Sequence, residues 1–145
     1  MWIELQKDIA RPAPDVYAFL VDPSRLSLWV KGLVVHEPLP GPERGVGARF
    51  RQELQISGSA YAFDGRITHD EPGRVFGYRL EHAEAALTTR FDLRGLSAGT
   101  LVVVTNEAQL KSLRLKFVKG MVERFLREQM ALSLDRLAAA IETSG

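Results

Sequence analysis

Hydrophobic and polar residues alternate with a period of two through most of the first 105 residues. In residues 2–9, Ile3, Leu5 and Ile9 fall on one face and the charged or amide side chains on the other. The same alternation returns in residues 46–56, 61–68, 76–81 and 87–94. Because successive side chains of a strand point to opposite faces, each segment predicts a strand with one buried face.

Turn sequences separate these segments, as in Glu71-Pro72-Gly73-Arg74 and Ser97-Ala98-Gly99. A shorter strand is predicted over residues 33–39, and a last one around residues 101–105, whose apolar run leaves its facing open. Short strands joined by such turns are typical of an antiparallel meander or half-barrel.

Two short helices are predicted between the first strand and the meander. Pro12 and Pro14 end the strand, since proline cannot donate to a strand ladder, and residues 16–20 then show helical spacing. Asp22-Pro23-Ser24 breaks this helix and provides a cap for another over residues 26–30.

The chain closes with a pattern of helical period, which predicts one long amphipathic helix over residues 113–142. Its apolar positions advance by three or four residues: Val118, Val122, Leu126, Met130, Leu134, Leu137 and Ile141. Gly120 interrupts the pattern and marks either a bend, a close approach or a tolerated small residue.

Length, composition and charge narrow the class of protein. At 145 residues, one domain over residues 1–145 is expected. The net charge of +1 gives no electrostatic case for nucleic acid. The absence of cysteine excludes disulfides and thiolate metal sites, and fits a cytoplasmic protein. Apolar runs stay well below the roughly 18 residues of a membrane span. The three histidines lack metal-ligand spacing, and we expect neither a metal nor a cofactor.

This order of elements predicts an α+β fold in which a curved antiparallel sheet wraps around the long C-terminal helix. It resembles the helix-grip fold of the START and Bet v 1 (SRPBCC) superfamily, and more closely its bacterial polyketide cyclase/dehydrase-like and lipid-transport-like branch. The resemblance covers nearly the whole chain and rests on the segment 9–23, Trp29, Val46-Gly47 with Phe50, and Gly99-Thr100. It implies an internal cavity, but superfamily members include carriers of lipids, quinones, hormones and polyketides as well as cyclases and aromatases.

The predicted inward faces are apolar, with aromatic rings and a few polar groups, as a small-molecule site requires. We expect ligand contacts from the strands and from the first half of the long helix. The candidates are Phe50, Gln52, Tyr61, Phe63, Phe76, Tyr78, Phe91, Val118, Val122 and Phe125. Gln52, Tyr61 and Tyr78 would orient the ligand, with Asn106 as a further polar group. Access would require the loop 41–45, the turn at Gly73 and the first turns of the long helix to open.

Basic residues gather near the start of the long helix, where cations oppose the helix dipole. Between residues 111 and 127 there are six basic residues and one acidic residue. Arg114, Lys116 and Lys119 are interpreted as a basic collar at the cavity mouth. It would attract an anionic ligand head group, an acyl-carrier partner or an anionic membrane surface. A solvated face neutralised by neighbouring acids is the alternative.

Binding or transport of a hydrophobic small molecule, such as a lipid, isoprenoid or aromatic polyketide, is therefore the leading prediction. The sequence contains no nucleophile motif, phosphate-binding loop or dinucleotide fingerprint. An enzyme of cyclase, dehydratase or aromatase type remains an alternative, with Tyr61 or Tyr78 as proton donor. A protein-interaction module that uses the basic helix is a second alternative.

Overall fold

Seven antiparallel strands form one sheet in the computed structural model, which describes residues 1–144. Their order across the sheet is β1-β7-β6-β5-β4-β3-β2, so that every neighbouring pair except β1–β7 is joined by a hairpin or a loop. The strands are β1 (Trp2–Ile9), β2 (Leu33–Pro38), β3 (Arg49–Ile56), β4 (Ser59–Glu71), β5 (Val75–Glu81), β6 (Ala85–Leu96) and β7 (Gly99–Leu110).

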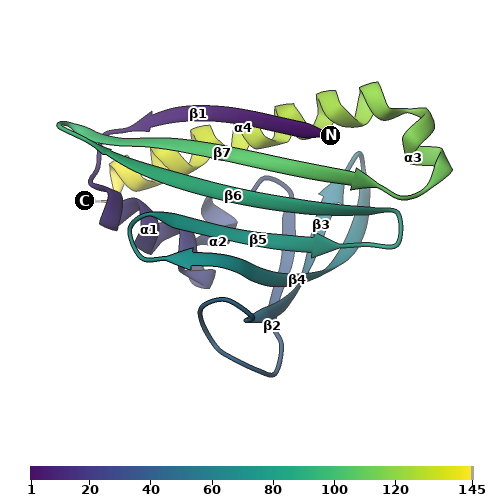
Figure 1. The fold of residues 1–145 in the computed structure, drawn as a ribbon, viewed down its shortest axis with the longest axis horizontal. Helices are drawn as coiled ribbons and strands as arrows, with labels where there is room; N and C mark the ends of the chain where they lie inside the picture. The colour runs from purple at the N-terminus through teal and green to yellow at the C-terminus, as the bar shows by residue number, and fades with distance from the viewer. Residues whose placement is uncertain (145) are drawn as a thin grey trace.

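The helices lie on one side of this sheet (Figure 1). They are α1 (Ala13–Val21), η1 (Pro23–Arg25), α2 (Leu26–Trp29), α3 (Leu113–Phe117) and α4 (Lys119–Thr143). The predicted helix-grip fold, with short helices after the first strand and a long helix at the C-terminus, is confirmed. The cap predicted for the helix over residues 26–30 is wrong in its target. Asp22 instead caps the preceding turn η1, by accepting a hydrogen bond from the backbone N–H of Ser24 at 3.0 Å, whereas α2 follows Arg25 without a side-chain cap.

The prediction of one continuous C-terminal helix is wrong in one detail. The backbone departs from helical geometry at Val118 (φ −107°, ψ 30°), which separates α3 from α4. The apolar spacing continues across this break, which is why the sequence pattern does not reveal it. Gly120 lies two residues further on, and open space surrounds the position that a Cβ atom would occupy, so no close approach requires a glycine there.

The C-terminal half of α4 is the part that the sheet grips. Leu134, Leu137, Ala138 and Ile141 are buried, whereas α4 has no buried residue before Leu134. An ion pair between Lys7 Nζ on β1 and Asp135 Oδ1 (2.9 Å) fastens the same half to the sheet edge. The N-terminal half of α4 therefore stands over the sheet without a dense core beneath it.

The inward faces predicted for the strands agree with the burial pattern, with one exception. Phe50, Phe63, Leu80 and Phe91 are buried, but Val46 precedes β3 and is exposed. The facing of β7, which the sequence left open, is set by Val102, Val104 and Asn106, whose side chains point toward the helices. Val102 and Val104 join the hydrophobic core, and Asn106 lines a cavity.

A helix that crosses a bilayer must be both long and apolar. Among residues 1–144, no helix combines the two properties.

Candidate functional site

Three cavities follow one another between the sheet and the helices. Cavity 1, of about 300 Å³, lies beside α1, α2 and the β2–β3 loop. Cavity 2, of about 120 Å³, lies under the middle of α4, and cavity 3, of about 430 Å³, lies under its first turns. Cavities 1 and 2 share Val30 and Tyr78 as lining residues, and cavities 2 and 3 share Leu87 and Leu126. Only a few side chains therefore separate each cavity from the next.

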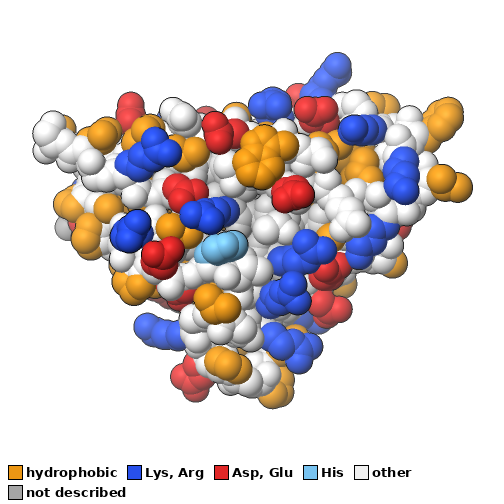
Figure 2. Space-filling model, viewed as in Figure 1, with side chains coloured by type: hydrophobic (Ala, Val, Ile, Leu, Met, Phe, Trp, Pro, Cys, Tyr) orange, Lys and Arg blue, Asp and Glu red, His pale blue; other side chains and the backbone are white. Residues whose placement is uncertain are grey.

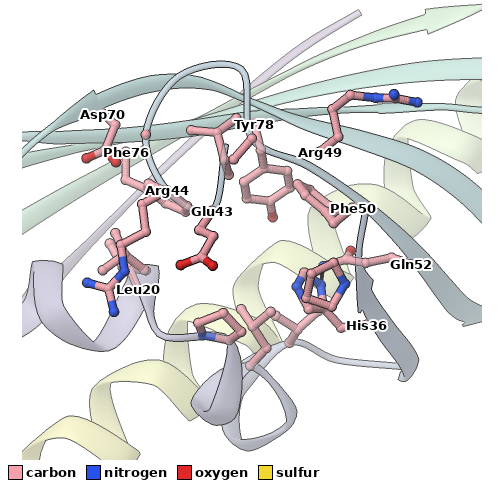
Figure 3. A pocket seen from close by; sticks show the side chains of 18 of the residues that line it. Leu20, His36, Glu43, Arg44, Arg49, Phe50, Gln52, Asp70, Phe76 and Tyr78 are labelled. Carbon is pink, nitrogen blue, oxygen red and sulfur yellow. Dashed lines mark hydrogen bonds between the residues drawn. The ribbon is translucent and has the colours of Figure 1, made fainter. Parts of the chain in front are cut away.

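Cavity 1 combines apolar walls with several polar side chains (Figure 3). Gln52 Nε2 and His36 Nδ1 are 3.0 Å apart, and the His36 ring lies against Phe50 with centroids separated by 5.1 Å. Burial lowers the pKa of His36, so its imidazole is neutral at pH 7 and has one donor and one acceptor nitrogen. This pair can offer a hydrogen bond to a neutral polar group.

A second polar pair lies across cavity 1. The Tyr17 hydroxyl on α1 donates a hydrogen bond to Asp70 Oδ1 on β4. Burial, followed by this hydrogen bond, raises the pKa of Tyr17 to about 12. Glu43 and Arg44 come from the exposed β2–β3 loop, and Figure 3 shows the Glu43 carboxylate directed into the same space as the Tyr78 hydroxyl. The loop thus covers cavity 1 with charged side chains.

Two bulges bring polar residues to this cavity. Between Ile67 and His69 the β4–β5 register shifts, so that Asp70 pairs with the inward-facing Phe76. A similar shift after Leu33 sets His36 opposite the buried Gln52. Because a shift of one residue exchanges the two faces of a strand, both polar side chains turn inward.

Cavity 2 holds a network of buried polar groups around Tyr78. Asn106 Nδ2 donates to Thr89 Oγ1 at 2.9 Å. Burial raises the pKa of Tyr78 to about 12, and a hydrogen bond with Thr89 has a smaller, opposite effect. Two buried atoms of cavity-lining residues, Trp29 Nε1 and Asn106 Oδ1, have no partner among residues 1–144. Since unpaired buried polar groups are costly, they are well suited to meet a hydrogen-bonding group of a ligand or a water molecule.

Cavity 3 is the largest of the three, and its walls are mainly apolar, with charged side chains among its lining residues. Tyr61 and Phe63 from β4 both pack against the ring of His82, with centroids 5.6 and 5.5 Å apart. Val122 and Phe125 of α4 face them across the cavity. At its edge, Arg114 Nη2 donates to both carboxylate oxygens of Glu84, at 2.6 and 2.7 Å, which lowers the pKa of that carboxyl.

All ten predicted ligand-binding residues line a cavity, but they are divided among the three. Phe50, Gln52 and Phe76 lie at cavity 1, Phe91 at cavity 2, and Tyr78 between these two. Cavity 3 receives Tyr61, Phe63, Val118, Val122 and Phe125. Of the basic collar, Arg114 lines cavity 3, while Lys116 and Lys119 are exposed beside it.

Sequence reasoning missed several cavity residues. It gave no ligand-binding role to His36 or His82, nor to Tyr17, Asp70 or Arg44. The helical spacing around Tyr17 predicts only that one side of α1 is buried. The loop 41–45, expected to control access, does contribute Gly45 and Arg44 to cavity 1, whereas Gly73 lines none of the three cavities.

Comparisons with known proteins agree with this fold. The profile of the family described as polyketide cyclase / dehydrase and lipid transport matches residues 3–142. A comparison with curated protein sequences gives no match. A Thermus thermophilus protein superposes with a TM-score of 0.83 at 16% identity, over 97% of both chains.

Two further solved structures are similar. A Chromobacterium violaceum protein is 25% identical, with a TM-score of 0.73 over 99% of this chain and 98% of its own. The Zhui aromatase/cyclase of Streptomyces sp. R1128 is 17% identical, with a TM-score of 0.81 over 98% of this chain and 93% of its own.

Proposed function

Because this chain belongs to the polyketide cyclase / dehydrase and lipid transport family, we propose that it binds and carries a hydrophobic small molecule in its row of cavities. Lipids, isoprenoids and aromatic polyketides have the required chemistry. The observation that carries the proposal is the lining of the interior. All three cavities have mainly apolar walls, and buried hydrogen-bonding groups gather around Tyr78 where cavities 1 and 2 meet. Such a site would hold an elongated molecule with an apolar part and at least one hydrogen-bonding group.

The apolar part would fill cavity 3, where its burial contributes roughly 25 cal/mol per Å². The polar group would lie near Tyr78, the side chain shared by cavities 1 and 2. With a pKa of about 12, this phenol keeps its proton at pH 7 and donates a hydrogen bond. A carbonyl or hydroxyl oxygen is the matching acceptor.

Native mass spectrometry of the purified protein, followed by solvent extraction, tests this function. We expect a one-to-one adduct whose extracted molecule is hydrophobic and carries an oxygen acceptor. A probe makes the test independent of what co-purifies: N-phenyl-1-naphthylamine should bind and increase its fluorescence. A clean apo mass together with no probe binding would contradict the proposal.

Two tryptophan substitutions on α4 supply a matched pair. Val122→Trp should fill part of cavity 3 and weaken probe binding about tenfold, because the apolar space is lost. Leu132→Trp changes an exposed residue of the same helix that lines none of the three cavities, and it should leave binding unchanged. Equal effects of both variants would place the probe elsewhere.

An aromatase or cyclase is the second candidate, favoured by the polar groups around cavity 1. In such a reaction a methylene carbon of a poly-β-ketone bonds to a ketone carbon. The methylene proton passes to the ketone oxygen, and water is then lost. Tyr78 would donate a hydrogen bond to that oxygen. A Tyr78→Phe variant that still binds a linear poly-β-ketothioester but no longer yields its cyclised, dehydrated product would favour the enzyme over the carrier.

A further inference from the structure

Three apolar side chains protrude at the end of the molecule formed by α3 and the first turn of α4. Phe117 is 93% exposed, Leu113 84% and Met121 71%. Leu113 and Phe117 are four residues apart on α3 and share one face of it, and Met121 follows in the first turn of α4. We call these three residues the apolar ridge. Figure 2 shows hydrophobic side chains projecting at the end of the molecule where Figure 1 places α3. Isolated exposed hydrophobics are ordinary, but a contiguous group of this exposure marks an interaction surface.

Basic side chains accompany the ridge. Lys116, Lys119 and Arg124 are exposed, and none of them forms an ion pair with another residue of the described chain, 1–144. We call these three residues the basic flank. The other basic residues nearby have acidic partners, since Arg114 pairs with Glu84, and Lys111 pairs with Glu81, which it shares with Arg79. The net positive charge of this end therefore lies directly beside the apolar ridge, where Figure 2 shows Lys and Arg side chains.

We propose that this end of the molecule binds the surface of an anionic lipid bilayer, with the apolar ridge in the boundary between head groups and acyl chains and the basic flank on lipid phosphates. Helices that carry protruding Phe or Leu together with Lys and Arg lie in this boundary. The ridge is convex, which suits insertion into a fluid layer better than packing against a rigid partner.

The surface formed by the apolar ridge and the basic flank is continuous with cavity 3. Met121 of the ridge and Arg124 of the flank also line cavity 3. A bilayer that covers the ridge therefore faces this cavity, and an apolar ligand would pass between them without crossing water. This inference rests on the proposed function for its purpose, but membrane binding can be measured without any ligand.

Vesicle flotation tests the proposal with the whole 145-residue chain. We expect binding to vesicles of phosphatidylcholine with about 30% phosphatidylglycerol, little binding to phosphatidylcholine alone, and loss of binding at high salt. Lys116→Glu with Lys119→Glu should weaken binding about thirtyfold or more, since each basic residue contributes to attraction by an anionic surface. Phe117→Ser should weaken it about tenfold by removing the inserted ring.

Matched controls lie away from this end. Arg66→Glu with Arg94→Glu makes the same change of charge on exposed strand residues, and Leu96→Ser removes an exposed leucine next to the β6–β7 turn. Both should bind vesicles like the unchanged protein. Since the chain lacks cysteine, Phe117→Cys labelled with an environment-sensitive dye reports insertion directly, and its emission should shift to the blue on anionic vesicles while a Leu96→Cys label does not.

Each outcome has a defined meaning. No vesicle binding, or equal binding by the control variants and the lysine variants, overturns the proposal. Binding that depends on the lysines but not on Phe117 also overturns it, because a purely electrostatic surface would serve an acidic protein, such as an acyl carrier, equally well. Probe binding in solution without vesicle binding would leave the proposed function intact while rejecting the membrane, and the reverse result would do the opposite.

Discussion

The ring of Phe50 lies directly over Gly65, on the neighbouring strand. A Cβ atom added at Gly65 would collide with this ring, whereas one added at Gly120 would meet open space. The absence of a side chain at Gly65 therefore decides where the wall of cavity 1 stands, since Phe50 is part of that wall.

Gly65→Ala should displace Phe50 toward cavity 1. We expect a loss of about 1–3 kcal/mol in the free energy of unfolding, the usual cost of overpacking, and weaker binding of N-phenyl-1-naphthylamine. Urea denaturation and a fluorescence titration measure the two effects. Gly120→Ala is the control, because a helical alanine should preserve stability or raise it by up to about 1 kcal/mol. Equal stability of both variants would show that Phe50 relaxes without cost.

The raised pKa of Tyr78 predicts that the free energy of unfolding decreases at alkaline pH. Its pKa is about 12 in the folded protein, compared with about 10 for an unfolded tyrosine. Between these values the unfolded state loses the proton and the folded state keeps it, so the free energy of unfolding falls as pH rises. The contribution of Tyr78 is complete below about pH 10.

Tyr78→Phe should therefore reduce the slope of stability against pH between about pH 10 and 12, and leave the slope between about pH 7 and 9 unchanged. Urea denaturation at a series of pH values measures it. Tyr17, whose pKa is also about 12, continues to titrate in this variant and keeps part of the slope. An unchanged slope would mean that the Tyr78 phenol ionises freely in the folded state.

At the scale of elements, the loop between β5 and β6 is tied to α3 by more than one interaction. The Arg114 guanidinium donates hydrogen bonds to both carboxylate oxygens of Glu84, and the backbone N–H of Lys111 donates to the Glu84 carbonyl at 2.8 Å. These contacts join two elements that line cavity 3. They also hold the short helix α3, which has no buried residue of its own.

Removing the charge of Glu84 should loosen α3 without unfolding the protein. For Glu84→Gln we expect faster amide hydrogen exchange in residues 111–118 and faster probe dissociation. Global stability should change little, because the Arg114 side chain of the pair is 67% exposed. Hydrogen exchange followed by mass spectrometry resolves the segment. Glu53→Gln, which breaks the Arg51–Glu53 pair on β3, is the control. Unchanged exchange would show that backbone contacts alone hold α3.

Elements were predictable from the sequence where one physical signal dominates. Strict alternation identified the strands and most of their inward residues, because burial of one face imposes period two. The break at Val118 was not predictable, since the apolar positions keep helical spacing across it. Asp70 and His36 were not predictable either. Each follows a bulge, and a bulge depends on pairing with another strand, which the alternation within one strand does not record.

At the scale of the whole molecule, the sequence predicted an enclosed apolar space but not its division. The inward residues are assigned strand by strand, whereas the number of cavities depends on which side chains meet across the fold. Leu87 of β6 and Leu126 of α4 are 39 positions apart in the sequence, and together they line both cavity 2 and cavity 3. The polar character of cavity 1 likewise requires α1, the β2–β3 loop and β4 to come together.

The serial arrangement predicts how affinity depends on ligand length. For saturated fatty acids of increasing length, each added methylene buried in the cavities should strengthen binding about fourfold, as about 0.8 kcal/mol per methylene implies. The increase should continue until the chain fills the cavities that it can reach. A larger side chain at Leu87, between cavities 2 and 3, should shorten that reach.

Leu87→Trp should therefore leave the affinity for short acids nearly unchanged and stop the increase at a shorter chain than in the unchanged protein. Displacement of N-phenyl-1-naphthylamine by fatty acids of about 6 to 18 carbons measures the affinities of the unchanged protein and of the variant. Unchanged affinity for the short acids shows that the variant is folded. A parallel loss at every length would mean that the cavities do not act in series. An unchanged series would mean that a ligand occupies only one of them, and the polar groups around Tyr78 would then belong to a site separate from cavity 3.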